Sequence, residues 1–213
     1  MDAQRWSIGL LLLGLLAPGV QAAGTSTAQN EEGAPRFLAG FGVAVEGSNL
    51  DDWAQSGTTG VRYEYASGGT AGDLYTGVEV LRWFSFRLGY HHFGEQEANL
   101  YTASGYAGDL FLEGSGNFLA LDALYPLTNN TQLGLTLGTL SWSTEAEARY
   151  LDGSVARRRD TGRDGFAGLR GRWLIEEGRG AFTVFFNRYR LDTDDTDEDL
   201  IFNDIGLGLE LRL

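Results

Sequence analysis

The sequence predicts an all-β fold, an eight-stranded antiparallel up-and-down transmembrane β-barrel formed by one domain. The first observation is composition, because 31 glycines and 12% aromatic residues against only 3 prolines in 213 residues favour many strands over helices. The second is that segments in which every second residue is apolar recur along the chain. The third is that the links between these segments alternate between short turns and long polar stretches, as they do in transmembrane barrels.

The chain begins with a segment that predicts a cleaved secretory signal peptide over residues 1–22. A short polar start precedes an apolar run at residues 8–17, and a small-x-small cleavage pattern ends the segment. The apolar run is too short to cross a bilayer as a helix, which needs about 20 residues. Residues 23–36 are small and polar without periodicity, so we expect a flexible periplasmic leader before a barrel that spans residues 37–213.

Eight segments have the period-two pattern of half-buried strands. Short turns join the second to the third, the fourth to the fifth and the sixth to the seventh. A ninth strand-like segment at residues 61–66 would break the up-and-down parity, so we expect it to form a hairpin arm in a long first loop. The polar links at residues 94–116 and 143–162 are also expected to be outer loops. The eight strands are expected at residues 37–47, 76–80, 84–93, 116–127, 132–140, 164–175, 181–191 and 203–213.

Alternation alone does not distinguish a membrane barrel from a soluble one such as a lipocalin, whose apolar face points inward. The polar face of the predicted strands carries four carboxylates and four guanidinium groups among many glycines. An eight-stranded barrel has room only for side chains, so small residues must lie between large ones and buried charges must be paired. We therefore expect the leucine rows to face acyl chains and the charged groups to face the axis. The charged residues of this face are Glu46, Glu79, Arg87, Asp122, Arg170, Arg172, Glu210 and Arg212.

From this face we predict a structural ion-pair network inside the barrel. A buried charge without a partner is costly, so mutual neutralisation explains why these residue types share one face. The alternative is that the same charges line an ion pathway. The predicted network consists of Glu79, Arg87, Asp122, Arg170, Arg172, Glu210 and Arg212.

Large aromatic residues lie near the predicted strand ends, where the interface girdles of a membrane barrel are found. Parity would point Trp142 inward, so we assign it to a loop. The expected girdle residues are Trp83, Tyr125 and Trp173 near the short turns and Tyr90 and Tyr189 near the long links.

Three stretches carry a resemblance to a known family: FRLGYHHFGEQ, ALDALYPLTNNTQLGLTLG and NRYRLDTDDTDEDLIFNDIGLGLELRL. They resemble the third strand, a periplasmic turn and the closing hairpin of small outer-membrane β-barrels of the OmpA-like transmembrane type, over residues 37–213. The resemblance implies a monomer in a Gram-negative outer membrane, with lipids, lipopolysaccharide and the outer-membrane assembly machinery as partners. That family usually ends in Phe, which the machinery reads, whereas this chain ends in Leu213. No peptidoglycan-binding domain follows the barrel, so wall anchoring is not expected.

We expect a structural or surface-interaction role through the extracellular loops, with no cofactor and no enzymatic activity. A narrow gated pore for small solutes or ions is the first alternative, a lipid A-modifying enzyme the second and a soluble periplasmic barrel for an apolar ligand the third. A net charge of −13, with all 16 basic residues Arg, argues against binding to nucleic acid. Because cysteine is absent, disulfides and thiol chemistry are excluded.

Two of the predicted outer loops carry clusters of charge. Arg157, Arg158 and Arg159 could contact the lipid A phosphates of lipopolysaccharide through bidentate guanidinium bonds, or simply be solvated. The segment DTDDTDEDL has carboxylates at a density that could hold Ca²⁺ or Mg²⁺. It lacks the turn Gly and distal Glu of an EF-hand, so a solvated acidic loop is the competing interpretation. Its weak metal candidates are Asp192, Asp194, Asp195, Asp197 and Asp199.

The two histidines, His91 and His92, are adjacent on a predicted strand. Adjacent side chains point to opposite faces, so this pair cannot chelate one metal ion by itself. A lipid A-modifying barrel needs a histidine near a nucleophile such as serine. The His-x-Ser-Asn pattern of the lipid A deacylase is absent, which leaves Ser85 or Ser141 as candidates for such a pairing in space.

Overall fold

The computed structural model of the protein describes residues 35–175, 178–193, 196 and 198–213. The predicted signal peptide and nearly all of the predicted leader lie outside these residues. No helix in the described chain is long and apolar enough to cross a membrane. The elements are β1 (Arg36–Ser48), α1 (Leu50–Ser56), β2 (Arg62–Ser67), β3 (Thr70–Leu81), β4 (Phe84–Thr102), β5 (Gly105–Pro126), β6 (Thr131–Tyr150), β7 (Val155–Ile175), β8 (Gly180–Leu191) and β9 (Leu200–Arg212).

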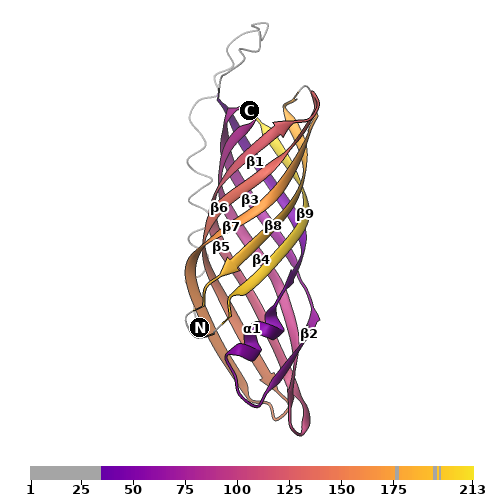
Figure 1. Ribbon diagram of the computed structural model, residues 1–213, viewed down its shortest axis with the longest axis vertical. Helices are drawn as coiled ribbons and strands as arrows, with labels where there is room; N and C mark the ends of the chain where they lie inside the picture. Colours follow the sequence, from indigo (N-terminus) through magenta and orange to yellow (C-terminus); the bar gives the residue numbers. More distant parts are fainter. Residues whose placement is uncertain (1–34, 176–177, 194–195, 197) are drawn as a thin grey trace, which may run out of the picture. The chain divides into compact units, whose positions relative to one another are not determined.

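Eight of the nine described strands form one closed antiparallel barrel (Figure 1). β1 pairs with β3 on one side and with β9 on the other, and the pairing of β4 with β5 completes the ring. The backbone N–H of Phe37 donates to the carbonyl of Leu213 at 3.0 Å, and the N–H of Leu213 donates to the carbonyl of Phe37 at 2.8 Å. The barrel wall therefore has no open edge between its first and last strands, as a sheet in lipid requires. The predicted eight-stranded up-and-down barrel is confirmed.

β2 is the ninth strand and lies outside the ring. It pairs with β4, from Arg62 opposite Tyr101 to Ser67 opposite Glu97. The prediction that residues 61–66 lie in the first long connection and do not span the barrel is confirmed. Their partner is an extension of β4 beyond the end of β3.

The extension of β4 beyond the end of β3 shows that the prediction of long outer loops is wrong. β4 and β5 continue through residues 94–115 and turn at residues 103–104, while β6 and β7 continue through residues 143–162 and turn at residues 151–154. The links expected to be outer loops are therefore paired strands, which extend past the rest of the barrel at the end where α1 and β2 lie (Figure 1). Apolar residues such as Ala98 and Leu112 continue the period-two pattern on the inner face there, and charged neighbours conceal it in the sequence.

The barrel wall nearest the short turns carries apolar side chains on its exterior. On β6, Leu133, Leu135 and Leu137 are 49%, 57% and 59% exposed. Nine residues of β1, Phe37 to Val45, cross this wall, close to the about 9–11 residues that a transmembrane strand needs. The predicted direction of the leucine rows is confirmed. We call this part the belt section, which comprises residues 37–45, 74–80, 84–90, 119–125, 133–137, 167–173, 182–186 and 205–213.

Beyond the belt section the polarity of the two faces is exchanged. The interior carries apolar residues such as Leu100 and Leu112, which are 0% and 1% exposed, while Glu147 and Arg157 lie on the exterior. This is the polarity of a water-soluble protein. We call this part the outer section, which comprises α1, β2 and residues 93–115, 139–165, 190–193 and 198–202.

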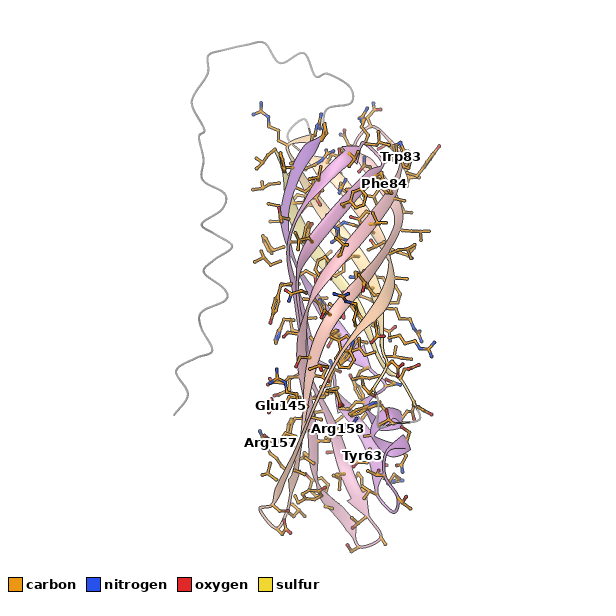
Figure 2. All side chains as sticks on the ribbon, turned by 90° about the vertical axis from the view of Figure 1, so that its left-hand side faces the viewer. Tyr63, Trp83, Phe84, Glu145, Arg157 and Arg158 are labelled. Carbon is orange, nitrogen blue, oxygen red and sulfur yellow. The ribbon has the colours of Figure 1, made fainter. Side chains whose placement is uncertain are left out.

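Aromatic residues mark the two edges of the belt section, with two corrections. Tyr189 is not a girdle residue: it is 2% exposed, because the exterior positions of β8 are the even-numbered ones such as Phe186. Trp142 is not in a loop but in β6, and its Nε1–H donates to Asp164 Oδ2 at 2.7 Å. Figure 2 shows Trp83 at the short-turn end, away from Tyr63 in the outer section. The predicted girdle residues that lie on the exterior are Trp83, Tyr90, Tyr125 and Trp173.

Candidate functional site in the barrel interior

The interior of the belt section contains a network of buried ion pairs, which begins with Arg87 of β4 and Asp122 of β5. Arg87 Nε lies 2.6 Å from Asp122 Oδ2, and Nη2 lies 2.9 Å from Oδ1, so the pair is bidentate. Ser85 Oγ and Thr136 Oγ1 donate to the same carboxylate at 3.3 and 2.7 Å. The carboxylate is 0% exposed and is satisfied on both oxygens.

Glu210 of β9 joins two arginines of β7. Arg172 Nε lies 2.9 Å from Glu210 Oε1, and Arg170 Nη2 lies 3.3 Å from Oε2. The hydroxyl of Tyr75 donates to Oε2 at 3.1 Å and accepts from Arg170 Nη2 at 2.5 Å. The guanidinium of Arg87 lies 4.8 Å from the centre of the Tyr75 ring, which connects this group to the first pair through a cation–π contact.

Glu79 of β3 completes the network. Arg172 Nη1 lies 3.0 Å from Glu79 Oε2, and Arg212 Nη2 contacts Glu79 Oε1. Arg212 Nη1 also donates to the carbonyl of Gly178 at 3.0 Å. Since β3 and β7 are four positions apart around a ring of eight, the contact between Glu79 and Arg172 crosses the full width of the lumen.

The structure brings together all seven residues of the predicted network. They project inward from five different strands, and each of the three carboxylates contacts at least one guanidinium. Removing both hydration shells is expensive, and close pairing compensates for that cost. The arrangement ties opposite walls of the barrel together.

A second group of buried ionisable residues lies at the outer edge of the belt section. His91 Nδ1 of β4 is 2.7 Å from Asp73 Oδ1 of β3, and His91 Nε2 is 3.8 Å from Glu46 Oε2 of β1 and 3.6 Å from Asp204 Oδ2 of β9. Glu46, His91 and Asp204 are 1%, 1% and 0% exposed. An imidazole nitrogen with carboxylate oxygens is a set of atoms that could ligate a metal ion.

The sequence pattern predicts Glu46 on the polar face but does not indicate its association with His91. Because the second expected strand begins only at residue 76, Asp73 is not among the predicted interior charges. Strand alternation was sufficient to predict that Asp204 and His91 face the interior. Asp204 alternates with Gly residues on the same face of β9 as Glu210. His91 has the interior parity of Arg87 on β4.

Aromatic rings close the lumen beyond this group. The ring centroid of Phe93 lies 4.4 Å from that of Phe202 and 5.4 Å from that of Tyr189. Phe166 approaches Tyr189 at 4.9 Å, and Tyr189 stacks on His91 at 4.7 Å. We call Phe93, Phe166, Tyr189 and Phe202 the aromatic plug; all four are buried.

Helix α1 covers the core beyond the plug. Its Trp53 is 4% exposed, and the indole Nε1–H donates to Thr193 Oγ1 at 2.8 Å. Asn49, at the start of the helix, donates through Nδ2 to the carbonyl of Asp199 at 3.0 Å and accepts the N–H of Ile201 at 2.7 Å. These bonds attach the connection between β1 and β2 to the start of β9.

The three arginines expected in an outer loop lie in β7 instead, and strand alternation separates them. Arg157 Nε and Arg159 Nε, on the exterior, donate to Glu147 Oε2 at 2.5 Å and to Ser143 Oγ at 3.1 Å. Arg158 points the other way, and its guanidinium lies 5.6 Å from the Trp53 ring. The structure therefore does not place the three side chains on one surface.

The acidic segment after β8 is described only in part. Asp199 forms an ion pair with Arg190, and the backbone N–H of Asp192 donates to Asp164 Oδ2 at 3.1 Å. The metal candidates that lie outside the described residues are Asp194, Asp195 and Asp197.

The structure does not bring either candidate serine to His91. Ser85 lies on the same strand roughly 20 Å away, at about 3.3 Å per residue, and bonds to Asp122. Ser141 faces the exterior of β6, whereas His91 faces the interior of β4. His92 is exposed on the exterior.

Comparison with known proteins agrees with this architecture. No protein-family model matches the chain, and no curated protein is similar to it in sequence. Among solved structures, the attachment invasion locus protein Ail of Yersinia pestis is similar, with a TM-score of 0.51 and 10% identity over 85% of this chain and 99% of that chain. Neisserial surface protein A is also similar, with a TM-score of 0.50 and 12% identity over 84% and 97% of the two chains. The chain has the fold of a small outer-membrane β-barrel.

Proposed function

We propose that this protein resides in the outer membrane and acts at the cell surface through its outer section, without conducting solutes. The belt section supports membrane insertion, because rows of exposed leucines between aromatic edges match the apolar band of a transmembrane barrel. The short turns would then face the periplasm and the outer section the outside. Of the two similar structures, one is named an attachment invasion locus protein and the other a surface protein.

The observation that carries the proposal is that side chains occupy the lumen at two levels. The contact between Glu79 and Arg172 crosses the full width of the belt section. Farther out, Phe93, Tyr189 and Phe202 pack against one another with 2% exposure or less. A pore would require both levels to open, and separating buried ion pairs without water is costly.

Lipopolysaccharide is the proposed partner at the outer edge of the belt section. Arg163 on β7 and Arg188 on β8 are exposed and lie beyond the apolar exterior positions Leu169 and Phe186, on the side of the outer section. Arg159 lies on β7 still farther from the belt section. Guanidinium groups at this level suit the phosphates of lipid A, which they can bind in a bidentate manner. This surface replaces the run Arg157, Arg158 and Arg159 of the sequence analysis.

Topology is tested with single cysteines, because the chain contains none of its own. The two variants are Ser154→Cys in the β6–β7 turn and Thr128→Cys in the β5–β6 turn. Heat-modifiable gel mobility establishes that each expressed variant is folded. A membrane-impermeant maleimide added to intact cells is expected to label Ser154→Cys and to label Thr128→Cys only after lysis. Equal labelling of both on intact cells, or of neither, would contradict the proposed surface role.

Conduction is tested in planar bilayers. The folded wild-type barrel is expected to give no discrete channel openings, because both levels of the lumen are filled. Frequent, salt-dependent openings would replace the proposal by the narrow gated pore. Phe93→Ala/Phe202→Ala removes two of the four plug rings and leaves the ion pairs in place, so continued absence of openings would assign closure of the lumen to the ion-pair network.

A further inference from the structure

We propose that Glu46, His91 and Asp204 form a binding site for one divalent transition-metal ion, with Zn²⁺ the best fit, between the ion-pair network and the aromatic plug. One donor atom of each residue lies within 4.8 Å of the others. All three side chains are buried, with 1% exposure or less. The site is independent of the proposed surface role.

The donor atoms converge on one point and lack other partners. His91 Nε2 is 3.6 Å from Asp204 Oδ2 and 3.8 Å from Glu46 Oε2. Bonds of about 2.0–2.2 Å to a tetrahedral ion would place such atoms roughly 3.4 Å apart, so the distances from His91 Nε2 to the two carboxylates are close to those of a bound ion. The two carboxylate oxygens lie within 4.8 Å of each other. Glu46 Oε2, His91 Nε2 and both oxygens of Asp204 have no hydrogen-bond partner. Unpartnered polar atoms at this depth are costly, and one cation satisfies all of them.

The neighbouring residues orient the ligands as supporting groups do in metal sites. Asp73 Oδ1, 2.7 Å from His91 Nδ1, can accept a hydrogen bond from Nδ1–H, which leaves the lone pair of Nε2 directed at the two carboxylates. Gln96 Nε2 donates to Glu46 Oε1 at 2.9 Å, which leaves Oε2 for the ion. The stacked ring of Tyr189 fixes the plane of the imidazole.

The balance of charged residues in the interior also favours a bound dication. The belt section and its outer edge enclose six carboxylates but four guanidinium groups among the described residues. A divalent ion bound to a neutral imidazole balances them. The competing explanation is that His91 is protonated and that Glu46 and Asp204 share a proton. The groups are Glu46, Asp73, Glu79, Asp122, Asp204 and Glu210 against Arg87, Arg170, Arg172 and Arg212.

The donor set selects the class of metal. Imidazole with two carboxylates suits Zn²⁺ and related transition ions, whereas Ca²⁺ and Mg²⁺ prefer oxygen ligands alone. Glu46 and Asp204 are direct partners in the β1–β9 register, and Asp73 and His91 are direct partners in the β3–β4 register. The ion would therefore clamp the first and last strands of the barrel to β4. Since protein encloses the site on both sides, we expect the ion to enter during folding.

The test uses the full barrel without a histidine tag, refolded in detergent with Zn²⁺ or with EDTA and then desalted. Elemental analysis is expected to find about one zinc per chain in the wild type and in His92→Asn, and under about 0.1 in His91→Asn and Asp204→Asn. His92→Asn is the matched control, because it removes the exposed neighbouring histidine. Heat-modifiable mobility establishes that each variant is folded.

A second readout needs no variant. With ¹⁵N-labelled histidine, the chain gives signals from two imidazoles only. Zn²⁺ during refolding is expected to shift the Nε2 resonance of the buried ring and to leave that of the exposed ring unchanged. Zinc content in folded His91→Asn equal to that of the wild type, or His91 resonances identical after refolding with Zn²⁺ and with EDTA, would overturn the proposal. The result would instead support a protonated His91 with a proton shared by Glu46 and Asp204.

Discussion

The belt section and the outer section share strands, register and the period-two alternation, yet their two faces have opposite polarity. In the belt section Leu135 faces outward at 57% exposure while Arg170 is buried inside at 2%. In the outer section Leu112 is buried at 1% while Arg157 lies outside with 65% of its side chain exposed. A β-barrel fold therefore does not determine which of its two faces is apolar. The surrounding solvent does, and β4 to β7 pass from one solvent to another along a single strand.

The exchange is visible within β6. Its exterior positions run from Leu133 and Leu137 to Glu145 and Glu147, while its interior positions change from Thr136 to Ala146. The charged interior of the belt section must be neutralised by pairing, whereas the outer section is held together by burial of apolar area. The two sections should therefore respond differently to the same kind of substitution.

The largest expected effect is the loss of one ion-pair partner in the belt section. Asp122→Leu leaves Arg87 buried without its carboxylate, and the free energy of unfolding is expected to fall by about 3–5 kcal/mol. Arg87→Met/Asp122→Leu removes both charges and should recover at least half of that loss. Urea unfolding in lipid vesicles, followed by tryptophan fluorescence, measures both. A double variant as unstable as the single one would mean that the charges are not paired in the folded barrel.

A cavity in the outer section should cost about as much, for a different reason. Phe202 is 0% exposed and stacks on Phe93 at 4.4 Å. Phe202→Ala is expected to cost about 3–5 kcal/mol, and Phe202→Leu under about 1.5 kcal/mol, as in a soluble core. Equal costs for the two variants, in the same unfolding assay, would contradict close packing of the plug.

A charge added to the exterior separates the two sections directly. Leu207→Arg on the belt section is expected to destabilise the barrel by about 2–4 kcal/mol, because the guanidinium meets acyl chains. The matched change Leu151→Arg, at a 69% exposed position of the outer section, should alter stability by at most about 0.5 kcal/mol. Similar values for both, measured in vesicles, would place the boundary between the sections elsewhere.

The smallest expected effect concerns the arginines at the edge of the belt section. Arg159→Gln/Arg163→Gln/Arg188→Gln should lower the lipopolysaccharide that co-purifies with the barrel by roughly two-fold or more, since bidentate phosphate contacts are lost. The control replaces an equal number of arginines farther from the belt section, Arg62, Arg149 and Arg157, with Gln. Equal lipopolysaccharide content in the two triple variants would remove the proposed contact.

Sequence periodicity predicted the belt section well, because large apolar residues alternate there with small or charged ones, as Leu207 and Leu209 do with Gly208 and Glu210. It missed the extensions of β4 to β7, where apolar interior residues such as Ala98 and Leu112 alternate with charged exterior ones such as Glu97 and Glu113. Such segments have low mean hydropathy and are easily taken for loops. Asp73 and His91 are partners across the hairpin of β3 and β4, but their association with Glu46 and Asp204 depends on the pairing of β1 with β9, which are far apart in the sequence and could not be predicted to meet in this register.

The most direct measurement of the exchange in polarity is a nitroxide scan along β6 in lipid vesicles, from residue 132 to residue 147, with one cysteine per variant. Accessibility to oxygen, which concentrates in the bilayer, is expected to peak at residues 133, 135 and 137. Accessibility to a water-soluble nickel chelate is expected to peak at residues 143, 145 and 147, and the even-numbered positions between them should be low for both reagents. Oxygen accessibility highest at residues 132, 134 and 136, or nickel accessibility equal along the whole strand, would contradict the account.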